Sequence, residues 1–262
     1  MRVIAAGLDR RLPGQPVVVL ESGAPDPVPG FSSLETWKAL LPELTRNGPV
    51  IAYERRGTGL SEPDSETPTM ARVARVLHAL LAELRVAPPY VLVGHSWGGN
   101  YIRAFTDQFP SEVKGLVFID AYTGTQATRD ERAAVVLPED RAAALATPVL
   151  PSLPANTPPG IKAELEQVGL EIVNDGQEAR RFRPLFGIPV AVIVATPPNR
   201  MRGSNGAVTR QGIQRDLELV LSLPNSLLVT ANHVGHAVHE RDPALVARLV
   251  EHVLRHPPAA AK

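Results

Sequence analysis

The sequence predicts an α/β fold built on a mostly parallel, doubly wound sheet, and three observations lead to this prediction. Short apolar runs alternate with longer helical patterns along the whole chain. The runs are apolar on both faces, as parallel strands covered by helices must be. The chain has 262 residues, 44% of them hydrophobic and 21% charged, which suits a folded domain with a substantial core.

The expected elements follow in order along the chain. Six buried strands are predicted at residues 16–20, 49–53, 90–93, 115–119, 189–195 and 226–230. Five helices are predicted at residues 34–46, 69–85, 97–109, 209–221 and 243–254. Two helices begin next to a proline, at Thr67-Pro68 and Asp242-Pro243, where the missing N–H costs no hydrogen bond.

One stretch breaks the alternation of strands and helices. Residues 122–184 contain two helical patterns, at 128–146 and 161–182, joined by the proline-rich segment 147–160. An insertion of about 60 residues is too long for an ordinary connection. We therefore expect a core domain at residues 1–121 and 185–262 with a helical cap at 122–184. The alternative is a pair of surface helices with no role at a site.

Charge and composition exclude several functions. The chain balances 27 Lys and Arg against 27 Asp and Glu, which argues against a nucleic-acid partner. It has no cysteine, so disulfide scaffolds, Cys-ligated zinc and thiol nucleophiles are excluded. No window reaches the ~18 consecutive apolar residues of a membrane span, and the first residues do not resemble a signal peptide. A cytoplasmic location is the default expectation.

The strongest motif is Gly94-His95-Ser96-Trp97-Gly98-Gly99, which lies between a predicted strand and a predicted helix. A G-x-S-x-G motif in this setting forms a sharp turn that lifts the serine hydroxyl above the sheet. The glycines provide space where side chains would collide, and the helix N-terminus favours developing negative charge. This context makes Ser96 the candidate nucleophile.

A serine hydroxyl needs a base to take its proton. Three histidines, His233, His236 and His239, follow the last predicted strand. We favour His236, because Gly235 allows the backbone to bend and bring the next side chain back over the sheet. His233 is the second choice, and His239 is expected to pack or to face solvent. A zinc site made by the three imidazoles is a less favoured alternative, since it leaves the serine turn unexplained.

The base in turn needs a carboxylate that fixes its tautomer. The loop after the strand at residues 189–195 contains no Asp or Glu before Asp216, which lies inside a helix and should point elsewhere. Asp120 follows the strand at residues 115–119 directly and is our candidate acid. Its alternative role is a turn residue that accepts backbone hydrogen bonds.

An oxyanion formed at the substrate carbonyl needs two hydrogen-bond donors. The backbone N–H of Trp97, next to the nucleophile, is one candidate. The other is the backbone N–H of Ala24 in the loop Glu21-Ser22-Gly23-Ala24-Pro25, where Gly23 permits close approach. The alternative is that this loop is a plain turn.

These motifs resemble those of the α/β-hydrolase superfamily over essentially the full chain. The matching segments are ESGAP, YERRGTGLS, GHSWGG, FIDAY and VGHAVHERDP. The order of serine, acid and histidine is also that of the superfamily. The resemblance implies an eight-stranded, mostly parallel sheet, a helical cap between strands six and seven, a Ser–His–acid triad and no cofactor.

The sequence departs from the superfamily pattern at two places. The usual His-Gly oxyanion motif appears as Ser22-Gly23, which leaves main-chain donation possible, and the common acid after strand seven is absent. Some related haloalkane dehalogenases place their acid after strand six, which supports Asp120. Dehalogenases and epoxide hydrolases use an Asp nucleophile, so Ser96 argues against both activities. The run from Arg55 to Ser61 lacks the GK[ST] ending of a phosphate loop and is expected to be a structural turn near the site.

We therefore expect a serine hydrolase, carboxylesterase-like, that cleaves an ester, thioester, lactone or amide of a small, largely apolar molecule through an acyl-enzyme. The alternatives are a carbon–carbon bond hydrolase, acyltransferase or lyase, and a ligand-sensing protein of the same fold. Apolar residues of the cap suggest an apolar pocket, although they could simply pack the cap: Leu137, Leu145, Val149, Leu150, Leu153, Leu165 and Val168. The sequence does not indicate an oligomeric state.

Overall fold

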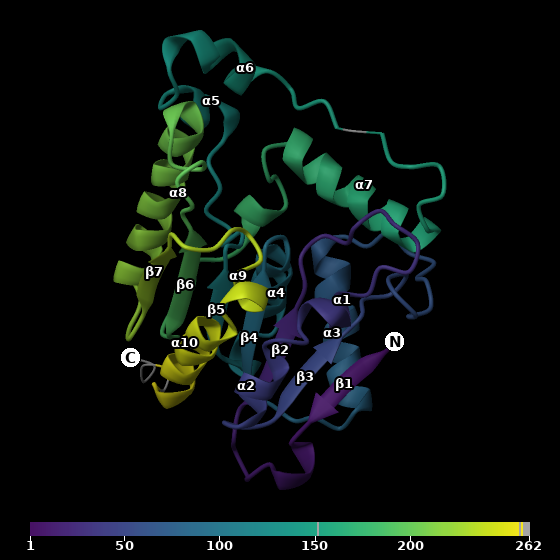
Figure 1. The fold of residues 1–262 in the computed structure, drawn as a ribbon. Helices are drawn as coiled ribbons and strands as arrows, with labels where there is room; N and C mark the ends of the chain where they lie inside the picture. The colour runs from purple at the N-terminus through teal and green to yellow at the C-terminus, as the bar shows by residue number, and fades with distance from the viewer. Residues whose placement is uncertain (151, 257, 259–262) are drawn as a thin grey trace.

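A twisted sheet forms the centre of the molecule in the computed structural model, which describes residues 1–150, 152–256 and 258. Within these residues the sheet has seven strands in the order β1-β3-β2-β4-β5-β6-β7 (Figure 1). Only β1 runs antiparallel to its neighbour, and the others are parallel. The strands are β1 (Val3–Ala6), β2 (Val17–Glu21), β3 (Val50–Tyr53), β4 (Tyr90–His95), β5 (Val113–Ile119), β6 (Val190–Ala195) and β7 (Leu227–Ala231). The predicted α/β fold class is confirmed.

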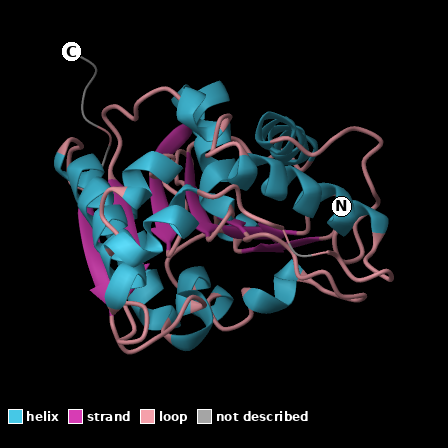
Figure 2. Cartoon of the chain, turned by 90° about the horizontal axis from the view of Figure 1, so that it is seen from above, coloured by secondary structure: helices cyan, strands magenta, loops and turns pink. Residues whose placement is uncertain are grey.

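Helices cover both faces of the sheet, as the view from above shows (Figure 2). One face packs against α3 (Met70–Glu83), α4 (Gly98–Gln108) and α8 (Gly203–Leu221). The other packs against α1 (Ser33–Thr36), α2 (Leu41–Thr45), α9 (Val238–Arg241) and α10 (Pro243–Arg255). Because both faces are covered, β2 to β6 are apolar along almost their whole length. No helix of the described residues is both long and apolar enough to cross a bilayer.

The sheet has one strand fewer than the eight that the superfamily resemblance implies. A single short strand, β1, precedes β2 in this chain and pairs with β3 at the edge of the sheet. Strand β1 was not predicted, because its four apolar residues are too few to distinguish a strand and all four are partly or fully exposed. The helical insertion therefore falls between β5 and β6.

Two predicted helices are broken by proline. The helix expected at residues 34–46 is divided into α1 and α2, with Pro42 in the first turn of α2. The helix expected at residues 128–146 is divided into α5 (Arg129–Ala133) and α6 (Arg141–Leu145), with a 3-10 turn that begins at Pro138 between them. Leu137, before Pro138, has the extended backbone that residues before proline prefer. Pro42 has no N–H to donate to the carbonyl of Lys38, so α1 does not continue into α2.

The other predicted insertion helix ends early for a different reason. Helix α7 (Pro159–Val173) stops where Asp175 and Gly176 adopt left-handed backbone, with φ of 55° and 71°. A 3-10 turn follows at Ala179–Arg181. In Figure 1, α5, α6 and α7 lie above the ends of the strands, on the side to which the carboxyl ends point. They can therefore reach groups at that edge.

Candidate active site

Ser96 sits on a strained turn between β4 and α4. Its φ is 51°, in the left-handed region that non-glycine residues rarely adopt. The turn is possible because a Cβ on Gly94 would lie 2.8 Å from the backbone of Gly98, so only glycine fits there. The Ser96 amide is held by the carbonyl of Ile119 at 3.2 Å. The serine is therefore fixed at the carboxyl edge of the sheet at its centre, as predicted for this motif.

Asp120 and His236 form a direct pair. Asp120 follows β5, His236 follows β7, and Asp120 Oδ2 lies 2.6 Å from His236 Nδ1. In this arrangement Nδ1–H donates to the carboxylate, which leaves Nε2 free to accept a proton. The sequence predicted that both residues follow strands at the carboxyl edge of the sheet, and the structure brings them together across β6 and 116 positions of sequence.

Two further groups hold the carboxylate of Asp120. The backbone N–H of Ala195 donates to Oδ1 at 3.0 Å, and the guanidinium of Arg200 donates to both oxygens at 2.8 and 2.7 Å. Burial opposes ionisation, but these partners and His236 together lower the pKa of Asp120 below its ordinary value. Asp120 is therefore a buried, ionised carboxylate at neutral pH.

Arg200 is a residue that the sequence analysis missed. It lies in the loop after β6, which has no carboxylate. The loop instead supplies a cation to the carboxylate that stands at the end of β5. The absence of Asp and Glu from residues 196–202 was visible in the sequence. The pairing of Arg200 with Asp120 was not, because it depends on the path of the loop.

The other two histidines of the loop do not lie at the Asp120 carboxylate. The His233 side chain is 57% exposed and pairs with Asp242 at 2.9 Å. His239 is buried, packs against Trp37 and His95, and has its pKa lowered to about 2 by burial and by the neighbouring imidazoles. This agrees with the expectation that His239 packs. Among the three loop histidines, His236 alone pairs with Asp120.

His95 supports the loop that carries His236. Its Nε2 lies 3.1 Å from the carbonyl oxygen of His236, to which it can donate, and the two rings are 4.6 Å apart. Burial and the nearby His236 lower the pKa of His95 to about 4, so the ring is neutral at neutral pH. A neutral ring with Nε2–H is the form that can hold this carbonyl.

The two candidate oxyanion donors belong to segments next to Ser96. Trp97 follows Ser96 directly, and within the described residues its amide donates no hydrogen bond. The loop after β2 passes next to the nucleophile, since a Cβ on Gly23 would lie 3.0 Å from Cβ of Ser96. The amide of Ala24, the next residue, also has no acceptor in the described residues. Both N–H groups are therefore available.

A buried arginine holds the loop after β2 through hydrogen bonds to its backbone carbonyls. Arg55, only 4% exposed, donates to the carbonyl of Ser22 at 2.8 Å and to the carbonyl of Gly23 at 2.6 Å. The same guanidinium pairs with Glu21 at 2.6 Å and with Glu164 of α7 at 2.7 Å. Arg55 thus links β2, the loop after it and the inserted helix α7.

Two tyrosines complete this buried network. Tyr53 donates to Glu21, and Tyr101 donates to Glu164 at 3.1 Å. Burial and the two carboxylates raise the pKa of both hydroxyls well above the ordinary value, so both remain donors. The sequence analysis expected only a structural turn at Arg55. It could not find the pairing with Glu164, which lies 109 residues away on a helix with no distinguishing motif.

A cavity of about 440 Å³ opens beside the candidate triad. Ser96, Asp120 and His236 all line it. Within the described residues the Ser96 hydroxyl makes no hydrogen bond to His236, a contact that often forms only when substrate binds. The cavity has room for a small organic molecule next to the serine.

The walls of this cavity combine polar and apolar groups, but from other residues than those expected. Its polar lining residues come from the segment after β5 and from the loop after β6 and helix α8: Thr123, Thr125, Gln126, Arg132, Arg200, Thr209, Arg215 and Asp216. None of the seven apolar insertion residues expected at a pocket lines it, and Leu137, Leu145, Val149 and Leu150 are exposed. The expected apolar residues of the insertion therefore do not form the pocket, and its apolar lining comes instead from Ala121, Tyr122, Ala127, Val194, Val208 and Ile213.

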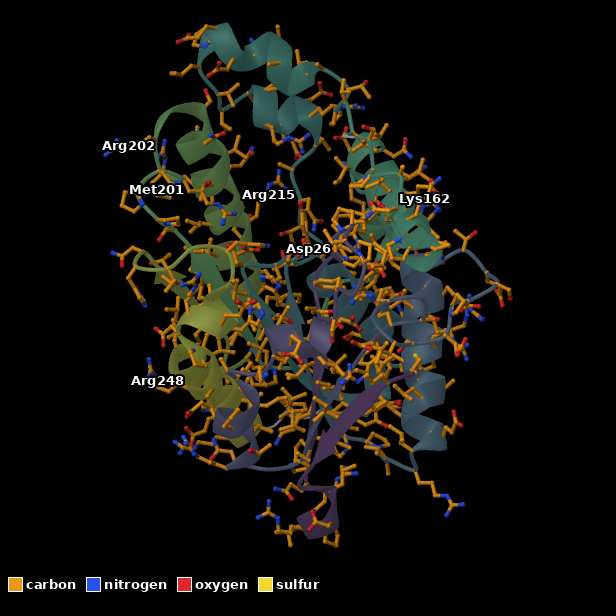
Figure 3. All side chains as sticks on the ribbon, turned by 45° about the vertical axis from the view of Figure 1, so that its right-hand side comes forward. Asp26, Lys162, Met201, Arg202, Arg215 and Arg248 are labelled. Atoms are coloured by element: carbon orange, nitrogen blue, oxygen red, sulfur yellow. The ribbon has the colours of Figure 1, made fainter. Side chains whose placement is uncertain are left out.

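Asp216 lies away from the histidine, as expected for a residue inside a helix, but it is part of the cavity wall. It does not contact His236, and it accepts a hydrogen bond from Thr123 at 2.8 Å. Arg215, its neighbour on α8, points toward the segment before α5 and donates to the carbonyl of Thr125 (Figure 3). Helix α8 therefore contributes charged residues to the site.

The chain belongs to the alpha/beta hydrolase family, because the model of that family matches residues 18–249. Solved structures with the same fold include a thermophilic esterase from Thermogutta terrifontis, with malate bound, and an enol-lactonase from Burkholderia xenovorans. The esterase has a TM-score of 0.64 at 19% identity, covering 97% of this chain and 92% of that chain. The enol-lactonase has a TM-score of 0.62 at 16% identity, covering 96% and 95%.

Curated relatives match over shorter regions. A 2-hydroxy-6-oxo-2,4-heptadienoate hydrolase from Pseudomonas putida is 32% identical over 128 residues, which is 45% of this chain and 43% of that protein. A proline iminopeptidase from Heyndrickxia coagulans is 35% identical over 122 residues, which is 45% and 38% respectively. The chain thus matches less than half the length of these relatives. Both of these relatives are named as enzymes that cleave a bond with water.

Proposed function

We propose that this protein is a serine hydrolase that cleaves a carboxylic ester, or a related thioester, lactone or amide, through an acyl-enzyme. The observation that carries the proposal is the strained Ser96 turn, which lines one cavity with the hydrogen-bonded pair of His236 and Asp120. A nucleophile, a base and a group that orients the base are the minimum set for acyl transfer by serine.

In the proposed reaction, Ser96 Oγ attacks the substrate carbonyl while His236 Nε2 takes its proton. Asp120 holds the imidazole through Nδ1 and stabilises the imidazolium that forms. The amides of Trp97 and Ala24 donate to the oxyanion. His236 then returns the proton to the leaving alcohol, and water attacks the acyl-enzyme by the same route in reverse.

The inserted segment, residues 122–184, is proposed to act as the cap of this site. Thr123, Thr125 and Arg132 come from it and line the cavity, and Glu164 joins it to the core through Arg55. Because the cavity combines these polar groups with apolar ones such as Val194 and Ile213, the substrate is proposed to be a small, largely apolar molecule with polar substituents. A cytoplasmic location remains a prediction from the sequence.

A second candidate reaction is hydrolysis of a carbon–carbon bond next to a carbonyl. The relative from Pseudomonas putida, named for hydrolysis of a 2-hydroxy-6-oxo-dienoate, favours it. Both reactions need a base and an oxyanion site, so the candidate residues are the same. Turnover of a 2-hydroxy-6-oxo-dienoate, in the absence of ester turnover, would favour this second reaction.

A panel of p-nitrophenyl esters tests the ester proposal. The protein should hydrolyse the short acyl esters, and Ser96→Ala should remain folded and lose turnover by up to ~10⁶-fold, as is usual for a triad nucleophile. The control is Ser65→Ala, at an exposed serine before α3 that does not line the cavity. Unimpaired turnover in Ser96→Ala would refute the serine mechanism.

A further inference from the structure

Asp216 is a carboxylate in the cavity that the proposed reaction does not use. It lies on α8, lines the cavity with Ser96, and is mostly withdrawn from solvent. Thr123 Oγ1 donates to its Oδ1 at 2.8 Å, and Thr123 is in turn 2.7 Å from Thr125 Oγ1. Hydroxyl groups are therefore the hydrogen-bonding partners of this carboxylate in the described part of the chain.

The other charged groups of the cavity are paired. Each of the three lining arginines has a carboxylate partner: Arg200 with Asp120 at 2.7 Å, Arg215 with Glu131 at 2.7 Å and Arg132 with Asp175 at 3.5 Å. Asp216 has no cationic group within 4.0 Å among the described residues. The cavity thus contains one carboxylate whose charge no neighbouring side chain compensates.

An uncompensated carboxylate away from water is costly for a protein. Burial, together with the nearby Asp120, raises the pKa of Asp216 to about 6. The group is therefore still largely ionised at pH 7.5. A ligand that brings a positive charge with N–H donors would supply the missing partner, whereas an anionic ligand would meet repulsion from both carboxylates.

We propose that Asp216 is the binding site for a protonated amine on the substrate, so that the cavity accepts cationic acyl compounds in preference to neutral or anionic ones. The inference rests on the proposed function only in taking this cavity as the substrate pocket. Ammonium N–H groups donate to the carboxylate of Asp216, while the carbonyl to be attacked lies at Ser96. Asp216 is thus a residue that determines specificity, and it takes no part in the proton transfers.

Three probes of equal chain length test this inference by calorimetric titration at pH 7.5: n-butylammonium, 1-butanol and butyrate. We expect n-butylammonium to bind at least ~10-fold more tightly than the other two, as a charge-assisted hydrogen bond in a shielded site allows. Asp216→Asn should reduce this preference to about 2-fold or less, since the amide keeps the shape and removes the charge. Glu218→Gln, an exposed charge on the same helix, should keep the full preference.

The order of the three probe affinities in the wild-type protein tests the proposal even if Asp216→Asn does not fold. Equal binding of the three probes, tighter binding of butyrate, or a preference that survives Asp216→Asn would each overturn it. In ester turnover n-butylammonium should raise KM and leave kcat unchanged, and a lowered kcat with unchanged KM would place it outside the cavity. The titrations are repeated in Ser96→Ala, so the binding result does not depend on whether the protein hydrolyses esters.

Discussion

The hydrogen bond between His236 and Asp120 determines which ring nitrogen is free at the candidate site. It joins Nδ1 to Oδ2 at 2.6 Å, while Arg200 and the Ala195 amide hold the same carboxylate from other directions. The carboxylate therefore cannot turn away from the imidazole without breaking several bonds. The free Nε2 is left to act on Ser96, which lines the same cavity.

The choice of base can be tested with two alanine variants. His236→Ala should abolish ester turnover, because no other ring in the loop lies at Asp120. His233→Ala should retain most of it, since His233 is exposed and pairs with Asp242. Steady-state rates with one p-nitrophenyl ester measure both. If His233→Ala were the inactive variant and His236→Ala the active one, the assignment of His236 would be wrong.

The role of the acid is tested by Asp120→Asn. The amide keeps the size of the side chain but can hold the wrong imidazole tautomer, so turnover should fall ~10²–10⁴-fold while the protein stays folded. Circular dichroism checks the fold, and the same ester assay gives the rate. The matched control is Asp140→Asn, an exposed residue that does not line the cavity. Turnover near the wild-type value in Asp120→Asn would exclude Asp120 as the acid of the triad.

At the scale of elements, the carboxyl ends of β2, β4, β5, β6 and β7 supply the groups of the site. The loop of Gly23 and Ala24 follows β2, and Ser96 follows β4. Asp120 follows β5, Arg200 lies in the loop after β6, and His236 lies in the loop after β7. Parallel strands place their carboxyl ends at one edge of a sheet, so residues far apart in sequence meet there. Helix α7 joins this edge through Glu164 and Arg55.

The link between α7 and the core predicts a large loss of stability in Arg55→Met. This change leaves Glu21 and Glu164 buried without their cation, which should lower the free energy of unfolding by about 3–5 kcal/mol. Arg56→Met, at the adjacent exposed arginine, should change it by no more than about 0.5 kcal/mol. Urea denaturation of the three proteins gives the comparison. Equal stability of the two variants would show that the buried network does not hold α7 to the core.

At the scale of the whole molecule, the sequence predicted those features that depend on local pattern. The apolar runs located β2 to β7, and the rule for strand ends placed Asp120 and His236 on one edge. The pairings of Arg200 with Asp120 and of Arg55 with Glu164 depend on loop paths and on how α7 docks, which no local pattern encodes. The residues that line the cavity were missed for the same reason, because the orientation of the inserted helices decides which side chains reach it.

The most direct test of the account is covalent labelling with a fluorophosphonate, followed by mass spectrometry of the intact protein and of its peptides. An activated serine should react once per chain, and the adduct should map to Ser96 within the peptide that contains Gly94-His95-Ser96-Trp97-Gly98. Ser96→Ala should remain unlabelled, and His236→Ala should react far more slowly. Labelling at another residue, or no reaction by the folded wild-type protein, would contradict the proposal that Ser96 is an activated nucleophile.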